Sequence, residues 1–295
     1  MSEVTIIGCG DIGSRVAKAC LARGDRVQGW VRTPASLERL RDLEIPDMQV
    51  DLDAPAAVIP GIHNHQLFYF APPPAAGQED HRVARLIQLC RESVSPSRVI
   101  YLSTSGVYGD CQGEWVDETR PPNPVVDRAR RRLDAESRWK AWSRETGGEL
   151  VILRVAGIYG PNKLPLQRLQ SGQPMVSEED SPITNHIHIF DLVKICLTAM
   201  QRGRTGEVYN VSDGHPGSMT GYFNQVADFL KLPRPPLITK AQAERLLSPG
   251  MLSYLRESRC LSNKKMLDEL GVVLSYPSLI EGLPACLTPK SWSEM

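Results

Sequence analysis

The chain has 295 residues, and 34 basic side chains balance 34 acidic ones to a formal net charge of zero. This length can bury a large core, in one large domain or in two closely packed ones. A neutral chain has no electrostatic footprint for nucleic acid or for an anionic membrane, so neither is expected as a partner.

The cysteines and the apolar runs indicate the compartment. The seven cysteines show no CxxC pair and no Cys/His ligand spacing, which favours free thiols in a reducing environment and no metal site. Val4–Ile7 already predicts a strand, so we expect no leader before it. The longest apolar stretch, Leu67–Ala76, contains three prolines and is too short to span a bilayer. We therefore expect a cytoplasmic protein.

Along the chain, short apolar runs alternate with helical patterns, which is typical of βαβ units. The predicted strands are Val4–Gly8, Arg26–Val31, Met48–Asp51, Leu67–Phe70, Val99–Ser103, Leu150–Arg154 and Val208–Val211. The predicted helices between them are Ser14–Ala22, Ala35–Leu43, Asp80–Ser93, Val126–Thr146 and Ile189–Met200. This alternation predicts an α/β fold with a Rossmann-type, doubly wound parallel sheet.

After about Gly160 the sequence becomes rich in loop-forming residues, and only separate helices at Met219–Leu230, Ala241–Leu247 and Asn263–Leu270 are predicted. We expect a dinucleotide-binding domain over residues 1–160, to which 185–214 return. Residues 161–184 and 215–295 form a smaller, discontinuous C-terminal lobe on the substrate side. Ligands in such folds lie beyond the carboxyl ends of the strands, where the two parts would meet.

The first strand runs directly into a glycine motif, Gly8-Cys9-Gly10-Asp11-Ile12-Gly13, followed by a helix. The first glycine permits a tight turn, the second lets backbone N–H groups approach a pyrophosphate, and the third lets the helix pack on the strand. The helix N-terminus adds unpaired donors for the phosphates. We assign the whole turn, Gly8, Gly10, Asp11, Ile12 and Gly13, to the cofactor. Glycines that serve only the turn and the packing are the alternative.

The end of the second strand indicates which cofactor is bound. NAD requires an acidic residue there for the ribose 2′-hydroxyl, but this chain has Trp30-Val31-Arg32-Thr33. A guanidinium suits a 2′-phosphate, so Arg32 predicts NADP. A solvated arginine that opens a loop is the alternative, and NAD then remains a candidate cofactor.

Several blocks in one order resemble the extended short-chain dehydrogenase/reductases of the NAD-dependent epimerase/dehydratase family, over nearly the whole chain. They are Ser103–Gly109 (STSGVYG), Arg154–Pro161 (RVAGIYGP), His188–Leu192 (HIFDL), Tyr209–Val211 (YNV), Ser262–Lys264 (SNK) and Leu270–Gly271. The resemblance implies that Asp51 meets the adenine, that Ala71 lies in the loop passing the cofactor, and that the protein is a homodimer.

The same register implies catalytic residues. Thr104 takes the place of the catalytic Ser/Thr, whose hydroxyl polarises a substrate oxygen, although a hydroxyl that caps the end of a strand is an equal alternative. Tyr108 lies four residues later and is the nearest candidate proton carrier. His186 and His188 border the expected cleft, but a lone histidine is more often structural.

The chain departs from the family where a helical Tyr-x-x-x-Lys pair is expected. Alignment of the family pattern on Glu118, Pro124, Leu133 and Glu136 puts Arg128 in the tyrosine position and Arg132 in the lysine position. Shifting this alignment by one residue still supplies no tyrosine. Arginine cannot release a proton near neutral pH. The literal Tyr159-x-x-x-Lys163 contains Gly and Pro, cannot hold helical spacing, and is rejected.

Three interpretations of this arginine pair remain. Arg128 and Arg132 could bind an anionic ligand, Arg132 could instead hydrogen-bond the nicotinamide ribose, or both could belong to a solvated basic face. Two functions remain as well. One is an NADP-dependent oxidoreductase or epimerase/dehydratase acting on a small polar, sugar-nucleotide-like substrate. The other is a non-catalytic NADP(H)-binding sensor or scaffold.

Overall fold

A seven-stranded parallel sheet forms the base of the molecule in the computed structural model, which describes residues 1–54, 59, 61–92 and 95–287. Its strands are β1 (Glu3–Ile7), β2 (Arg26–Val31), β3 (Asp47–Gln49), β4 (Gln66–Tyr69), β5 (Arg98–Thr104), β7 (Glu149–Val155) and β12 (Val208–Val211). They lie in the order β12-β7-β5-β4-β1-β2-β3. All seven predicted strands are present, and the predicted Rossmann-type fold is confirmed.

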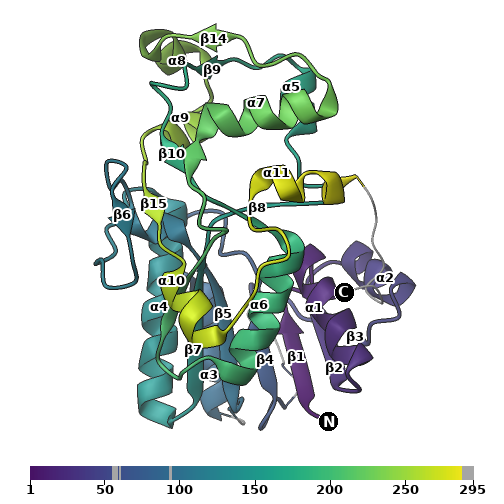
Figure 1. Ribbon diagram of the computed structural model, residues 1–295. Coiled ribbons are helices and arrows are strands. Elements are labelled where there is room, and N and C mark those ends of the chain that lie inside the picture. Colours follow the sequence, from purple (N-terminus) through teal and green to yellow (C-terminus); the bar gives the residue numbers. More distant parts are fainter. Residues whose placement is uncertain (55–58, 60, 93–94, 288–295) are drawn as a thin grey trace.

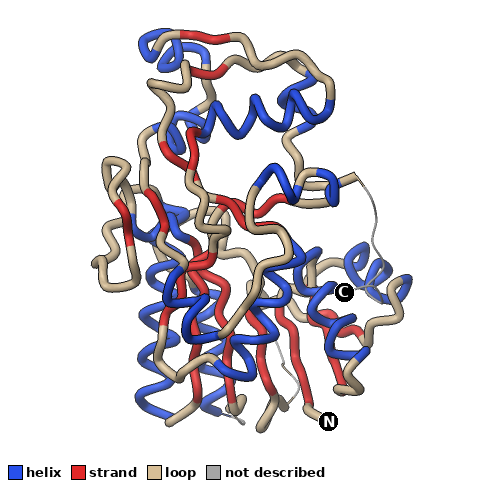
Figure 2. The backbone as a smooth tube through the Cα atoms, in the orientation of Figure 1, coloured by secondary structure: helices blue, strands red, loops and turns tan. Residues whose placement is uncertain are grey.

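Helices cover both faces of this sheet (Figures 1 and 2). One face packs on α1 (Asp11–Ala22), α2 (Pro34–Asp42) and α6 (Ile189–Arg202), and the other packs on α3 (His81–Glu92) and α4 (Asp127–Thr146). Ile6 points into the first core and Ile7 into the second. The strands are apolar on both faces because each face is covered.

A smaller lobe stands above the carboxyl ends of the strands (Figure 1). Its helices are α5 (Leu166–Gln170), α7 (Met219–Leu230), α8 (Lys240–Leu246), α9 (Pro249–Leu255) and α11 (Leu279–Gly282). Its own apolar cores include Met175, Phe223 and Val226 in one cluster and Val176 and Ala243 in another. These cores give the lobe a fixed surface to present to the sheet.

The remaining short strands join these parts. They are β6 (Trp115–Val116), β8 (Gly157–Tyr159), β9 (Met175–Val176), β10 (Ile183–Thr184), β11 (His186–His188), β13 (Gly217–Ser218), β14 (Leu237–Ile238) and β15 (Cys260–Leu261). Strand β15 pairs with β6, and β8 pairs with β11. Helix α10 (Lys264–Leu270) packs its Met266 and Leu270 into the sheet's core, so the chain returns to the sheet a second time. Our predicted division did not include this return.

The predicted helix boundaries are close to those observed, with one informative difference. Helix α1 begins at Asp11, three residues before the predicted start at Ser14. Gly10 is its N-cap, and Ser14 donates the first intrahelical bond to the Gly10 carbonyl at 2.8 Å. The last predicted residue of α3, Ser93, lies outside the described residues. Among the helices that the structure describes, none is both long and apolar enough to cross a bilayer.

Candidate functional site

The glycine turn ends in a helix terminus with free donors. The N–H groups of Asp11, Ile12 and Gly13 have no intrahelical acceptor because they belong to the first turn of α1, and Gly10 has no side chain to cap them. A Cβ built on Gly10 would meet only the Gly8 carbonyl oxygen, at 3.8 Å, which leaves open space in front of the turn. A Cβ on Gly13 would lie 3.1 Å from Ile6 Cγ2, so its absence allows the close packing of α1 on β1. This arrangement fits an anionic diphosphate.

A cavity of about 250 Å³ lies beside this turn, above the ends of β1, β2 and β4. Five residues predicted to bind the cofactor line it: Gly8, Gly10, Arg32, Asp51 and Ala71. Trp30, Thr33, Ser36, Arg39 and Arg82 complete much of the wall. The lining combines apolar surface with guanidinium and hydroxyl donors.

Arg32 stands at the rim of this cavity with 54% of its side chain exposed. It donates to Asp53 at 3.1 Å, and Arg82 donates to the same carboxylate at 2.5 Å. The hydrogen bond from Arg82, followed by those from His81 and Arg32, lowers the pKa of Asp53 despite partial burial. Arg32 is therefore held beside the cavity by a charged partner.

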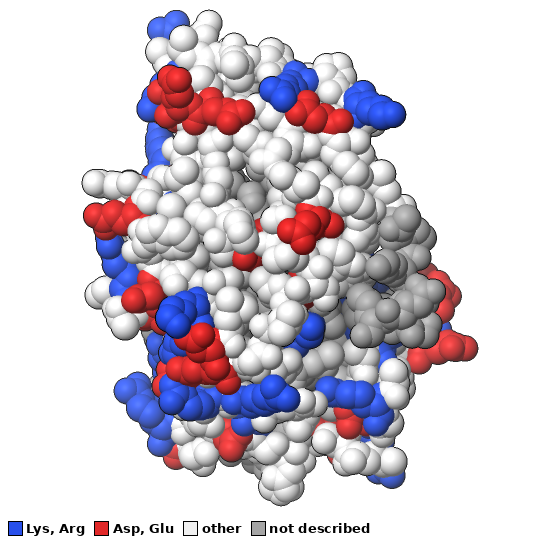
Figure 3. All heavy atoms as spheres, in the orientation of Figure 1, with Lys and Arg blue, Asp and Glu red and all other residues white. Residues whose placement is uncertain are grey.

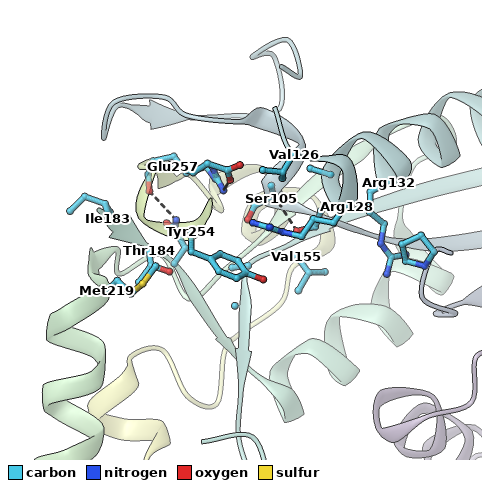
Figure 4. A pocket seen from close by; sticks show the side chains of 18 residues that line it. Ser105, Val126, Arg128, Arg132, Val155, Ile183, Thr184, Met219, Tyr254 and Glu257 are labelled. Atoms are coloured by element: carbon cyan, nitrogen blue, oxygen red, sulfur yellow. Dashed lines mark hydrogen bonds and ion pairs between the residues drawn. The ribbon is translucent and has the colours of Figure 1, made fainter. Parts of the chain in front are cut away.

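A second cavity, of about 430 Å³, lies between the sheet and the lobe. Thr104, Ser105, Arg128 and Arg132 line it from the sheet side. The lobe contributes Thr184, Tyr254, Glu257 and Arg259, among others (Figure 4). The two cavities adjoin each other, because the consecutive residues Pro72 and Pro73 line the first and the second cavity, respectively. Three arginines against one glutamate give the second cavity a positive balance.

Of the two predicted catalytic residues, Thr104 lines the second cavity and Tyr108 does not. The Thr104 hydroxyl oxygen accepts from the Gly106 backbone at 3.2 Å as a cap, and the same residue lines the cavity, so both interpretations of Thr104 are compatible with its position. Tyr108 is buried and lines neither described cavity. It donates to Asn210 Oδ1 at 2.8 Å, and burial raises the pKa of its phenol. Proton transfer from Tyr108 to a ligand would require that bond to open.

The two arginines on α4 have different surroundings. Arg128 donates to Ser253 Oγ at 2.7 Å, and its guanidinium lies 4.2 Å from the centre of the Tyr254 ring. The α4 residue assigned to the tyrosine position therefore reaches across to α9 of the lobe. Arg132 donates to the Ala71 and Leu102 carbonyls, at 3.4 and 3.1 Å. It therefore links the loop of the first cavity to the wall of the second.

The rejected Tyr159–Lys163 spacing falls on a strand and a turn. Tyr159 ends β8 and donates to the Ser278 carbonyl at 3.1 Å inside the lobe. Lys163 lies 2.9 Å from Asp11 at the start of α1, so it connects the glycine turn to the loop after β8. Burial opposes ionisation of Asp11, but hydrogen bonds from Lys163 and Arg15 lower its pKa below the usual value.

The two candidate histidines are packed among aromatic rings. His186 stacks on Tyr222 with ring centres 4.3 Å apart, and His188 accepts from the Phe190 backbone through Nδ1 at 3.3 Å. Burial lowers the pKa of each to about 4. Both rings are therefore neutral near pH 7, and His188 serves as the N-cap of α6.

The sequence did not single out the lobe side of the second cavity. Glu257 and Arg259 lie between α9 and β15, and they pair at 2.8 Å. Asn185, which lines the same cavity, donates to the Arg259 carbonyl and accepts from the Leu261 N–H. The nearest sequence signal was the Ser262–Lys264 block just downstream, which matched the family without assigning a role to the residues before it.

The fold defines a Rossmann-type α/β protein, with two adjoining cavities at the carboxyl ends of its strands. The family model described as "NAD dependent epimerase/dehydratase family" matches residues 4–212. The chain therefore belongs to that family.

Individual proteins are similar to this chain over nearly its whole length. Protein YeeZ of Escherichia coli K12 is 28% identical over 290 residues, which cover 94% of this chain and 97% of YeeZ. A structure described as a functionally unknown conserved protein from Silicibacter pomeroyi superposes with a TM-score of 0.84 at 29% identity, covering 97% of this chain and 98% of that one. UDP-glucuronic acid 4-epimerase from Bacillus cereus, in complex with UDP-glucuronic acid and NAD, has a TM-score of 0.74 at 18% identity and coverages of 96% and 97%. At that identity the likeness concerns the fold alone.

Proposed function

We propose that this protein binds NADP(H) in the glycine-turn cavity and oxidises or reduces a small polar, sugar-nucleotide-like substrate in the cavity between sheet and lobe. The observation that carries the proposal is the adjacency of the two cavities at Pro72 and Pro73, with Arg132, which lines the second cavity, bonded to the carbonyl of Ala71, which lines the first. A cofactor held by the first cavity would extend its reactive end toward the second. When bound, the nicotinamide would supply the hydride acceptor or donor.

The preference for NADP over NAD rests on basic and hydroxyl groups at the end of β2. Arg32, Thr33, Ser36 and Arg39 line one side of the first cavity. Arg39 is held in place by a 2.9 Å bond to the Cys9 carbonyl. Guanidinium and hydroxyl donors suit a phosphate on the ribose, whereas an NAD site needs a carboxylate there.

Thr104 is the residue proposed to polarise the substrate oxygen. Its hydroxyl oxygen accepts from Gly106, which leaves the hydroxyl proton free to donate into the cavity. Ser105 lines the cavity beside it. The sugar-nucleotide character of the substrate is carried over from relatives such as the Bacillus cereus epimerase, whose structure contains UDP-glucuronic acid. A homodimer and a cytoplasmic location are proposed on resemblance to the family.

A second candidate function, a cofactor-binding sensor without turnover, is favoured by one observation. Helix α4 contains no tyrosine, and Arg128 is bonded to Ser253 instead of presenting a proton-transferring group. A sensor would need the dinucleotide site and the lobe but no proton carrier.

The test begins with calorimetric titration of NADPH and NADH, for which we expect tighter binding of NADPH. Absorbance at the nicotinamide band is then followed with a panel of UDP- and dTDP-hexoses, using wild type, Thr104→Ala and Thr104→Ser. Turnover that is lost in the alanine variant and retained in the serine variant supports the enzyme. Cofactor binding with no turnover on any substrate supports the sensor. No binding of either dinucleotide at millimolar concentration refutes both.

A further inference from the structure

Glu257 lines the cavity between sheet and lobe, and one oxygen of its buried carboxylate has no hydrogen-bond partner among the described residues. Its side chain is only 3% exposed. Oε2 accepts from Arg259 at 2.8 Å, while Oε1 has no hydrogen-bond partner among the described residues. A buried polar atom without a partner costs free energy, because water no longer solvates it. Such an atom in a cavity wall indicates that a ligand supplies the missing donor.

The backbone around Glu257 holds the carboxylate in place. The Ser258 N–H donates to Asp110 Oδ1 at 2.9 Å, and the Ser258 carbonyl accepts from the Cys111 N–H at 3.0 Å. Arg259 also donates to the Gly109 carbonyl. The segment that carries Glu257 is therefore attached to the loop after β5 at several points.

Opposite charge faces this oxygen across the cavity. Figure 4 shows Glu257 and Arg128 reaching toward the same space from opposite sides, with the Tyr254 ring below them. Burial raises the pKa of Glu257, against the attraction of Arg259 and Arg128. Arg128 uses one N–H on Ser253, and the planar guanidinium has further donors that a ligand oxyanion can share.

We infer that Glu257 and Arg128 together select a ligand carrying both a hydroxyl donor and an anionic group, that is, a phosphorylated polyol, with Glu257 Oε1 accepting from the hydroxyl and Arg128 binding the anion. The inference rests on the proposed function, since it names which groups the substrate must offer. It adds a specificity-determining carboxylate on the lobe. The proposed function places its cofactor and its polarising hydroxyl on the sheet side.

Two probes of equal charge isolate the hydroxyl contact. D-Glucose 1-phosphate and methyl phosphate share a phosphate monoester, and only the first carries ring hydroxyls. Binding is measured calorimetrically with and without saturating NADP⁺. We expect the wild type to bind glucose 1-phosphate more tightly than methyl phosphate. Glu257→Gln should reduce that advantage about tenfold, because the amide oxygen is an uncharged and therefore weaker acceptor than the carboxylate. Methyl phosphate affinity should remain unchanged.

Controls separate this inference from folding and from the proposed function. Glu179→Gln changes an exposed carboxylate on the same lobe and should leave both affinities unchanged. If Glu257→Gln does not fold, Glu257→Asp keeps the charge, withdraws the oxygen by one methylene, and should show the same selective loss. The inference is overturned if the wild type does not bind glucose 1-phosphate up to about 10 mM, an affinity near the weak end of specific binding. It is also overturned if Glu257→Gln leaves the advantage intact or weakens both probes equally. Failure of the proposed function appears separately, as absent dinucleotide binding.

Discussion

The backbone of Ala71 occupies the position that a side chain at Gly8 would need. A Cβ on Gly8 would lie 2.3 Å from the Ala71 nitrogen and 2.4 Å from its Cα, and Gly8 has a φ of +79°. The loop after β4 therefore closes onto the turn after β1, and this contact forms one wall of the cavity assigned to the cofactor.

Gly8→Ala should therefore destabilise the fold and weaken dinucleotide binding. The left-handed backbone costs about 1–2 kcal/mol for alanine, and the clash with Ala71 adds about 1–3 kcal/mol. Gly24 is the matched control, because its φ is +84° and a Cβ there would meet nothing within 4 Å. Gly24→Ala should show the backbone cost alone in urea denaturation and should bind NADPH normally. Equal losses in the two variants would contradict this assignment.

Arg32→Ala should weaken the binding of NADPH but not the binding of NADH. Removing the guanidinium should weaken NADPH about tenfold, which corresponds to about 1.4 kcal/mol, and leave NADH nearly unchanged because NADH has no 2′-phosphate. Arg26 begins the same strand at its far end, with 70% of its side chain exposed, so Arg26→Ala is the control. Calorimetric titration with both dinucleotides measures the ratio. An equal loss for both would remove Arg32 from the 2′-phosphate site.

The α/β core could be predicted from the sequence because its signals are local. The apolar run before Gly8, the glycines of the turn and the periodic helices each specify their element without distant contacts. Helix α9 was not predicted, and it begins with Pro249 and Gly250, two residues that are poor helix formers. The structure uses that proline in the first turn of the helix, where its missing N–H is harmless, and Ser248 caps the helix by accepting from Met251.

The lobe side of the candidate site could not be predicted in this way. Glu257 belongs to the cavity only because Arg259 and the loop at Gly109–Asp110 fix the segment against the sheet, about 150 residues away in the chain. The count of charged side chains likewise predicted only the net charge of zero and not where charges of one sign gather. On the face in Figure 3, basic and acidic side chains lie next to one another over the α/β layer. The three arginines of the second cavity converge from α4 and from the segment before β15.

Arg154, which matched a family block, should contribute mainly to stability. It donates to both oxygens of Glu136, at 3.1 and 2.7 Å, with side chains only 3% and 0% exposed, and Ser103 donates to the same carboxylate. Arg154→Met leaves a buried charge without its partner and should cost about 3–5 kcal/mol. Adding Glu136→Gln removes that charge and should recover part of the loss in urea denaturation. Arg234→Met breaks an exposed pair with Asp228 and should leave the midpoint unchanged. An undiminished loss in the double variant would contradict the buried-charge explanation.

His188 should make stability depend on pH on the acid side of neutrality. Burial, with a smaller effect of Arg15, lowers its pKa to about 4 in the folded state, below the ordinary value of 6.5. The contribution is fully present above pH 6.5 and is lost as the pH falls toward 4, because only the unfolded chain takes up the proton. Between pH 7.5 and 5 the loss is about 2 kcal/mol. His188→Asn keeps an acceptor for the Phe190 N–H, so it should remove the His188 share of the acid-side loss while α6 stays capped. His186, whose pKa is also lowered to about 4, should retain its own share. His63→Asn, at an exposed site, should retain the wild-type curve. Urea denaturation at several pH values measures the free energy of unfolding of each variant. If the His188→Asn curve runs parallel to that of wild type, His188 is protonated equally in the folded and unfolded states, which would contradict the prediction.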